Sequence, residues 1–245
     1  PPRLTLYEGP QTMTSSPAAT VTANGYDLFV YDVMVNHEHI WNANTQPTTT
    51  PMTYFDFEGR VNIAVQMPGL EQAVESAQVL PSALGIVPKV AEGTVRFAIT
   101  EPGQYTVVFN GSVNKALHIF ANPLETDVPD PDDPNVFYIG PGEWVMDAIA
   151  LQDNQTLYLS GGAVLHSIIS VANADNVRIC GRGLIDGRDA RERSQLWLIT
   201  SKRLTSSRKT MTTRRSYEHH KREAYSPGHD AAAAVSDFKR VRPAH

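Results

Sequence analysis

Asp186 is the residue of this chain whose type and position most suggest chemistry. It ends a short apolar stretch, Leu184-Ile185, that follows the glycine-rich corner at 181–183. A carboxyl group held at the end of a strand could donate or accept a proton as a general acid or base. The next residue is Gly187, however, and Asp-Gly is a common turn pair. We therefore expect Asp186 to serve a turn, and the catalytic residues remain unassigned.

Two segments contain the residue types of a metal site. His37 and His39 alternate on either side of Glu38, so two imidazoles could share one ion if the segment were a strand. The sequence identifies no third ligand, and we expect loop histidines. Residues 125–134 contain five acids and three prolines, but not the glycine and glutamate spacing of a known calcium loop. We expect no metal site and no cofactor.

The elements that would position such residues repeat along the chain. Between residues 137 and 199 a three-residue apolar or β-rich kernel returns every twenty residues, and glycine-rich turns follow the first three kernels. A fixed period with one strand per repeat is typical of a solenoid, whose coils stack and share one core. Gly181 and Gly183 would allow a tight positive-φ corner, and a second strand per coil favours a parallel β-helix over 137–200. The kernels are FYI at 137–139, LYL at 157–159, VRI at 177–179 and WLI at 197–199; the second strands are 144–146, 164–166 and 184–186.

The preceding half of the chain indicates a different architecture. Residues 1–122 contain short β-rich segments separated by turn pairs, a pattern that favours an antiparallel β-sandwich. Asn110-Gly111 indicates a hairpin whose loop is longer than two residues. The acidic, proline-rich segment 123–136 should form an extended linker or strap between the two domains. The β-rich segments are 26–33, 61–65, 94–99, 105–109 and 116–120.

Charge is distributed unevenly along the 245 residues. Residues 202–245 contain 11 Lys and Arg against 4 Asp and Glu, whereas the rest of the chain contains 10 against 22. The segment 201–245 has too little apolar surface to offset its ordering entropy, so we expect a disordered basic tail. The tail lacks interleaved aromatic residues, and no apolar run reaches the roughly 18–20 residues of a membrane-spanning helix. We expect no nucleic-acid partner, no membrane partner and a monomer.

Several strings in residues 25–200 resemble a known family. They are PSALGI at 81–86, ALHIFANPLE at 116–125, FYIGPGEW at 137–144, QTLYLSGGAVL at 155–165 and NVRICGRGLIDGR at 176–188. Together they resemble the polygalacturonase-like glycoside hydrolases of family 28, and also the related dextranase and isopullulanase family. The resemblance implies an N-terminal sandwich, a right-handed parallel β-helix, secretion, and a polysaccharide substrate such as pectin. It implies inverting hydrolysis by an acid and a base carboxylate about 6.5–9.5 Å apart, with room for a water molecule between them.

The chain departs from that family where catalysis would be expected. The family places its carboxylates in Asn-Thr-Asp and Asp-Asp motifs, followed by Gly-His-Gly and Arg-Ile-Lys motifs, and none of these follows Asp186. The nearest string, 227–230 (PGHD), lies in the expected tail. We therefore expect a chain truncated before its catalytic coils that does not itself catalyse the family reaction. A dextranase-like hydrolase, a calcium-dependent lyase and a non-catalytic carbohydrate-binding module stay open as alternatives.

The remaining notable residues suggest packing or surface roles. Cys180 lies within a strand kernel and should be an inert core thiol, since a single cysteine forms no internal disulfide. His118 and His166 also lie in strands and should be hydrogen-bonded structural residues. The asparagines of two Asn-x-Ser/Thr sequences, Asn110 and Asn154, would permit glycosylation of a secreted protein. The tryptophans, which could stack on sugars but more often pack beside strands, are Trp41, Trp144 and Trp197.

Overall fold

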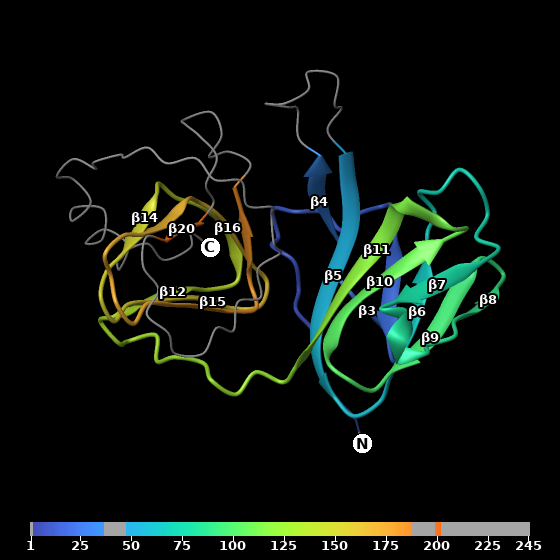
Figure 1. Ribbon diagram of the computed structural model, residues 1–245, viewed down its shortest axis with the longest axis horizontal. Coiled ribbons are helices and arrows are strands. Elements are labelled where there is room, and N and C mark those ends of the chain that lie inside the picture. Colours follow the sequence, from blue (N-terminus) through green and yellow to red (C-terminus); the bar gives the residue numbers. More distant parts are fainter. Residues whose placement is uncertain (1, 37–47, 188–198, 202–245) are drawn as a thin grey trace.

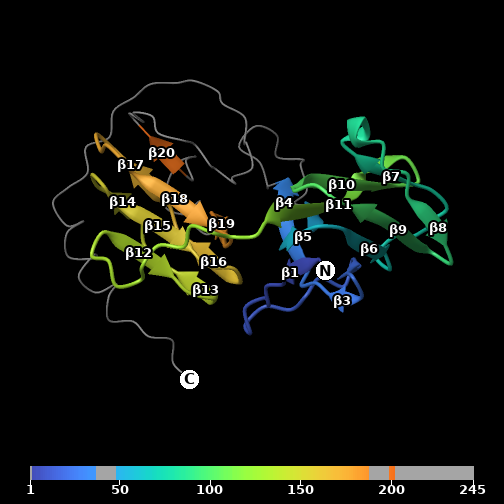
Figure 2. The ribbon, with the colours of Figure 1, turned by 90° about the horizontal axis from the view of Figure 1, so that it is seen from below.

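The computed structural model describes residues 2–36, 48–187 and 199–201. These residues form two parts that lie side by side, a β-sandwich and a stack of parallel strands whose three sheets enclose a common core (Figures 1 and 2). The described residues contain β-strands and one short 3₁₀ turn, η1 (Ser82–Leu84), but no α-helix. The expected all-β fold, with a sandwich followed by a parallel β-helix, is confirmed.

The sandwich consists of two sheets that enclose one hydrophobic core. One sheet has the order β1-β5-β11-β10-β7 with β4 also paired to β5, and the other has the order β3-β2-β6-β9-β8. Pairing is antiparallel as expected, except that β11 runs parallel to β5. Side chains from both sheets, among them Phe55, Ile63 and Leu117, fill the core. The strands are β1 (Arg3–Thr5), β2 (Thr20–Ala23), β3 (Tyr26–Asp27), β4 (Tyr31–Asn36), β5 (Thr48–Glu58), β6 (Val61–Gln66), β7 (Ala77–Leu80), β8 (Lys89–Ala91), β9 (Thr94–Ile99), β10 (Gly103–Phe109) and β11 (Ser112–Pro123).

Strand β5 packs against the sandwich core on one face and against the β-helix on the other, and the sequence analysis did not predict this strand. Phe55 and Phe57 point into the sandwich core, whereas Met52 and Tyr54 belong to a cluster that faces the β-helix. Successive side chains of a strand point to opposite faces, so a strand covered on both sides loses its apolar–polar alternation. All residues from 50 to 57 are buried, including Asp56.

Two expectations for the sandwich are wrong in detail. The segment 26–33 is divided between β3 and β4 rather than forming one strand. The hairpin between β10 and β11 has a two-residue turn, because β11 begins at Ser112, four residues before the expected β-rich segment 116–120. Asn110 and Gly111 have φ angles of 49° and 72°, which are the positive values that a type I′ turn requires.

The β-helix contains three parallel sheets, each with one strand per coil. The orders are β12-β15-β18, β13-β16-β19 and β14-β17-β20. Inward side chains, such as Leu157, Leu165 and Ile169, are fully buried in a second core. Residues 124–135 cross to the first of these strands, and within this strap Glu125 accepts a hydrogen bond from the Tyr158 hydroxyl at 2.9 Å. The strands are β12 (Val136–Ile139), β13 (Gly142–Val145), β14 (Ile149–Leu151), β15 (Thr156–Leu159), β16 (Ala163–His166), β17 (Ile169–Val171), β18 (Arg178–Gly181), β19 (Leu184–Asp186) and β20 (Ile199–Ser201).

The coil register departs from the constant period of twenty. Phe137 pairs with Leu157 twenty residues later, but Leu157 pairs with Ile179 rather than with residue 177. The turn after β17 is two residues longer than the turn after β14, and it buries Ala174 in the helix core. The fourth kernel, 197–199, is also misassigned: Ile199 belongs to the third sheet, where it pairs with Ile169, and residues 197 and 198 lie outside the described residues.

The corner at Gly181 explains why glycine is required there. Gly181 has a φ of 112°, and a Cβ at this position would lie 2.0 Å from the carbonyl oxygen of Leu159. Gly183 lacks the positive φ that the sequence suggested, but its Cβ would lie 2.7 Å from the Cβ of Leu159. The first glycine therefore satisfies a backbone conformation, and both glycines allow one coil to approach the next closely.

Several expectations fall on residues outside the described ranges. They are the possible metal site at His37, Glu38 and His39 and the packing roles of Trp41 and Trp197. Of the expected disordered tail 201–245, residues 202–245, which include the string at 227–230, also lie outside the described ranges, whereas Ser201 belongs to β20. Within the described residues, no helix is long and apolar enough to span a membrane.

Candidate functional site

The two parts meet along a contact surface that we call the seam. Its apolar centre joins Val164 and Leu184, on the outer face of the sheet β13-β16-β19, to Tyr31, Met52 and Tyr54 of the sandwich. Leu165 and Ile185, which follow Val164 and Leu184 in their strands, point into the core of the β-helix. Because successive side chains of a strand point to opposite faces, Val164 and Leu184 lie on the outer face. Polar groups of this face are therefore held close to the sandwich.

A row of three ionisable side chains lies on this outer face. We define the carboxylate–histidine row as Glu143, His166 and Asp186, which come from β13, β16 and β19. His166 is directly opposite Asp186 in the strand register. The His166 Nε2 lies 2.9 Å from Glu143 Oε1, and its Nδ1 lies 3.7 Å from Asp186 Oδ2. Thr12, from the N-terminal segment, donates its hydroxyl hydrogen to Glu143 Oε2 at 2.6 Å.

The geometry of the row limits the chemistry that it can perform. The His166 Nε2 and the Glu143 Oε1 form a hydrogen bond. The His166 side chain is 8% exposed and lies between the two carboxylates, where an inverting hydrolase would need space for a water molecule. The row thus binds the Thr12 hydroxyl of the N-terminal segment, and His166, rather than a water molecule, occupies the place between its acids.

A second polar group at the seam is a buried ion pair. Arg182, in the corner between β18 and β19, donates Nε to Asp56 Oδ1 at 2.8 Å and Nη2 to the Pro123 carbonyl at 2.8 Å. The Tyr7 hydroxyl donates to Asp56 Oδ2 at 2.9 Å. The Asp56 side chain is 1% exposed and that of Arg182 is 15% exposed. Burial by itself would lower the pKa of Arg182, but the hydrogen bonds and charge of Asp56 outweigh it and raise that pKa.

Tyrosines from three segments stack within the seam. The ring of Tyr54 lies 5.4 Å from that of Tyr7 and 5.8 Å from that of Tyr31, measured between centroids. The Tyr54 hydroxyl accepts a hydrogen bond from the Gly162 amide at 2.8 Å. Burial is the main cause that raises the pKa of each of the three hydroxyls. The stack therefore favours neutral phenols between the two parts.

We expect these tyrosines to make the fold sensitive to alkali. A raised pKa keeps a folded phenol protonated, so its contribution to stability is complete below the unfolded pKa of about 10 and is lost as pH rises above it. Tyrosinate absorbance should then rise in two steps, with the second coinciding with the loss of circular dichroism. A single early step for all nine tyrosines, with the dichroism retained, would contradict the buried stack.

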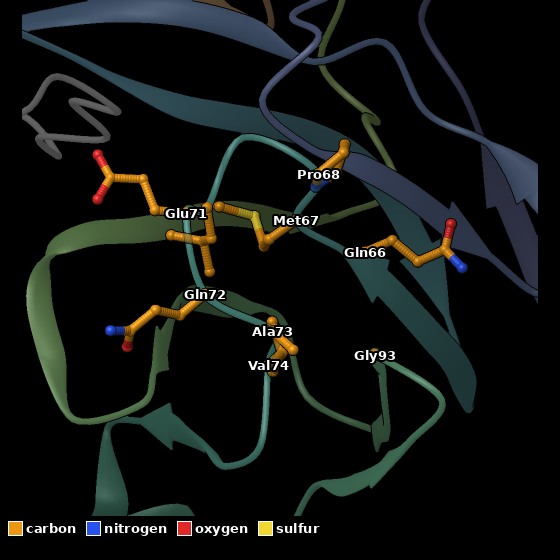
Figure 3. A pocket seen from close by; sticks show the side chains of 9 residues that line it. Gln66, Met67, Pro68, Glu71, Gln72, Ala73, Val74 and Gly93 are labelled. Atoms are coloured by element: carbon orange, nitrogen blue, oxygen red, sulfur yellow. The ribbon is translucent and has the colours of Figure 1, made fainter.

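Among the depressions on the surface of the described residues, two are notable. An open groove of about 710 Å³ lies between β1 and the strap, where Tyr7, Asp56, Glu125 and Thr126 contribute polar groups. This volume is within the range of small-molecule sites. A smaller one, of about 330 Å³, is lined by Met67, Val74, Gly93 and neighbouring residues of the sandwich (Figure 3). In that view Gln66, Glu71 and Gln72 point their polar ends outward. Neither depression borders the carboxylate–histidine row.

Several sequence candidates lie within the described residues. Asp186 ends β19 and faces His166, and its expected turn role stays a prediction because the chain after Gly187 lies outside the described residues. The His118 Nδ1 is 3.0 Å from the Thr106 hydroxyl, which agrees with a structural role. Trp144 packs against the helix core and donates Nε1 to the Gly140 carbonyl. Cys180 is half-buried on the outer face of β18 rather than in the core, and burial raises the pKa of its thiol. Within the described residues no cluster of His, Cys, Asp or Glu could hold a metal ion.

Sequence reasoning missed the partners of these residues. The separation between Asp56 and Arg182 is 126 positions, and no short-range pattern connects them. The one available signal for Asp56 was its place between Phe55 and Phe57, because a carboxylate inside an aromatic strand needs a buried cation. Glu143 carried no comparable signal, since exposed glutamates are common.

Comparison with known proteins supports the fold. No family model matches the chain, and no curated protein matches its sequence. Among solved structures, Dex49A from Penicillium minioluteum is similar with a TM-score of 0.51 and 13% identity, over 75% of this chain and 48% of that one. Dex49A is a dextranase with the β-helix fold of glycoside hydrolases. The similarity shows a shared fold, and this chain spans about half of that structure.

Proposed function

We propose that this chain contributes the sandwich and first coils of a polysaccharide-degrading glycoside hydrolase. The observation that carries the proposal is the docking of a sandwich against a parallel β-helix, an arrangement for which the dextranase Dex49A is a structural neighbour over 75% of the chain. The two acids of the row do not supply the inverting pair, because His166 lies between their carboxylates. Hydrolysis would then depend on further coils that carry that pair.

The proposed substrate is a neutral α-glucan of the dextran type. The first 201 residues contain 10 basic and 22 acidic residues, and such an excess repels a polyanion such as polygalacturonate. The groove beside the strap offers Glu125 and Thr126 as partners for sugar hydroxyls. A neutral polyol makes use of such groups without a charge penalty. The proposed protein is secreted, and its chemistry uses carboxylates and water without a cofactor.

A polygalacturonase-like hydrolase is the second candidate. The strings at 137–144 and 176–188 keep it in consideration, because they resemble that family as closely as they resemble the dextranases. The same architecture serves both substrates, so the fold by itself does not choose between them.

Binding and hydrolysis assays on the 245-residue chain separate these candidates. We expect dextran to retard the chain in native gel electrophoresis and polygalacturonate to leave its mobility unchanged, at about 0.15 M salt so that long-range attraction by the basic tail is screened. We expect neither polymer to release reducing sugar, because the row lacks room for an attacking water. Dextran of the same length with its hydroxyls methylated is the matched control.

The other outcomes are equally informative. Release of reducing sugar from polygalacturonate would establish the second candidate and overturn both the glucan proposal and the expected inactivity. Retardation by dextran alone, with no hydrolysis from a longer gene product either, would favour the non-catalytic binding module. No retardation by either polymer would remove the support for the glucan as substrate.

A further inference from the structure

The two Asn-x-Ser/Thr sequences are engaged in different ways by the fold. We propose that Asn154 is a site of N-linked glycosylation, whereas the side chain of Asn110 is a structural fastener that stays unmodified. The proposal depends on passage through a secretory pathway, and it does not depend on the proposed hydrolytic activity.

The amide of Asn110 is held on both of its polar atoms. Its Oδ1 accepts hydrogen bonds from the backbone amides of Glu75 at 2.9 Å and Ser76 at 3.1 Å. Its Nδ2 donates to the carbonyl of Ala73 at 2.9 Å. The backbone amide of Asn110 also donates to Ser76 at 3.0 Å. A sugar attached to Nδ2 would need the space between the turn at 110–111 and residues 73–76. The modified chain would therefore lose the contacts that hold residues 73–76 to the end of β10.

Asn154 is exposed and leaves its amide nitrogen available. It has a φ of 61° in the turn between β14 and β15. Its Oδ1 accepts a hydrogen bond from Nδ2 of Asn176 at 2.9 Å, in the equivalent turn of the next coil. Within the described ranges no hydrogen bond is found from the Asn154 Nδ2. The third residue of the sequence, Thr156, lies on the outward face of β15, because Leu157 points into the core.

The chemistry of the modification is compatible with these contacts. The Asn154 Nδ2 attacks the anomeric carbon of an oligosaccharide carried on a lipid pyrophosphate. A nitrogen–carbon bond forms, the bond from that carbon to the phosphate oxygen breaks, one amide proton is released, and the lipid pyrophosphate leaves. The product keeps the Asn154 Oδ1 as an acceptor, so the hydrogen bond from Asn176 survives. The turn lies on the side of the β-helix away from the sandwich (Figure 1), where a glycan does not disturb the seam.

Production of the full chain in a eukaryotic secretory host tests the proposal. Peptide N-glycosidase in ¹⁸O-labelled water, followed by mass spectrometry, marks each occupied asparagine as labelled aspartate. We expect the label at Asn154, complete loss of the glycan in Asn154→Gln, and no label at Asn110. The retained intracellular pool is analysed in the same way if little protein is secreted.

Asn110→Gln is the matched variant. We expect it to keep the glycan at Asn154 and to unfold at a lower urea concentration than the parent chain, whereas Asn154→Gln unfolds close to its enzymatically deglycosylated parent. If Asn110→Gln fails to fold, the parent and Asn154→Gln still decide the question. A glycan on Asn110 in folded protein, or an unoccupied Asn154, would overturn the proposal.

Discussion

Replacement of Arg182 by methionine should lower the free energy of unfolding by about 3–5 kcal/mol, the cost of leaving one member of a buried ion pair without its partner. The Asp56 side chain is 1% exposed, so a carboxylate that loses its guanidinium is left with little hydration to compensate. The Tyr7 hydroxyl would remain as a hydrogen-bond donor, but it is neutral. Methionine keeps much of the length and apolar contact of the arginine stem, so the effect reports charge and hydrogen bonding rather than a cavity. Urea denaturation followed by fluorescence measures the change.

The matched control is a second arginine–carboxylate pair, whose carboxylate, Glu58, lies on β5 like that of Asp56. Arg3 lies 2.7 Å from Glu58, but both side chains are more than 60% exposed. Arg3→Met should therefore change stability by at most about 1 kcal/mol. A double variant, Asp56→Leu with Arg182→Met, should be less destabilised than the sum of its single variants, because neither charge is then left unpaired. Equal effects of Arg182→Met and Arg3→Met would refute the importance of burial at the seam.

Replacement of Gly181 by alanine should disrupt the third coil. The φ of 112° is costly for any residue with a Cβ, by about 1–3 kcal/mol. The collision with the backbone of Leu159, whose carbonyl oxygen would be 2.0 Å from the new Cβ, adds to that strain. Since the obstacle is backbone in the preceding coil, relief requires β15 and β18 to separate. Hydrogen exchange should show faster exchange of the amides of β18 in the variant than in the parent.

Gly25→Ala provides the comparison for conformational strain without collision. Gly25 has a φ of 86° in the turn between β2 and β3, and a Cβ there would meet nothing within 4 Å. We expect this variant to lose only the strain of about 1–3 kcal/mol and to keep the exchange rates of β18. If Gly181→Ala were no more destabilised than Gly25→Ala, close stacking of the coils would not be what demands glycine at the corner.

The β-helix was accessible from the sequence because its pattern is local. Each residue of the kernel at 137–139 pairs with the residue twenty positions later in the kernel at 157–159. Stacked coils repeat the same inward positions at nearly the same spacing. The drift in later coils was not accessible. The turn after β17 is two residues longer than the turn after β14 and buries Ala174 in the core. This burial and the pairing of Ile199 with Ile169 became evident only from the tertiary structure.

The shared strand β5 and the seam lay beyond sequence reasoning for a related reason. Alternation identifies a strand with one buried face, but Tyr54 and Phe55 point to two different cores. The row of Glu143, His166 and Asp186 likewise forms because three coils align their outer faces against the sandwich. The sequence drew attention to Asp186 but not to its neighbour His166, which comes from the preceding coil.

The sequence by itself determined the class of fold, the order of its two parts, and the absence of catalytic motifs after Asp186. These depend on periodicity, turn residues and composition, which are properties of short stretches of chain. Only the tertiary structure decided that Arg182 binds Asp56, that His166 lies between two carboxylates, and that Asn110 rather than Asn154 is fastened on both amide atoms. Those contacts join residues that are apart in the chain, so no short-range pattern reports them. For Arg182 and Asp56 the free energy that selects the contact depends on burial, which exists only once both parts have folded together.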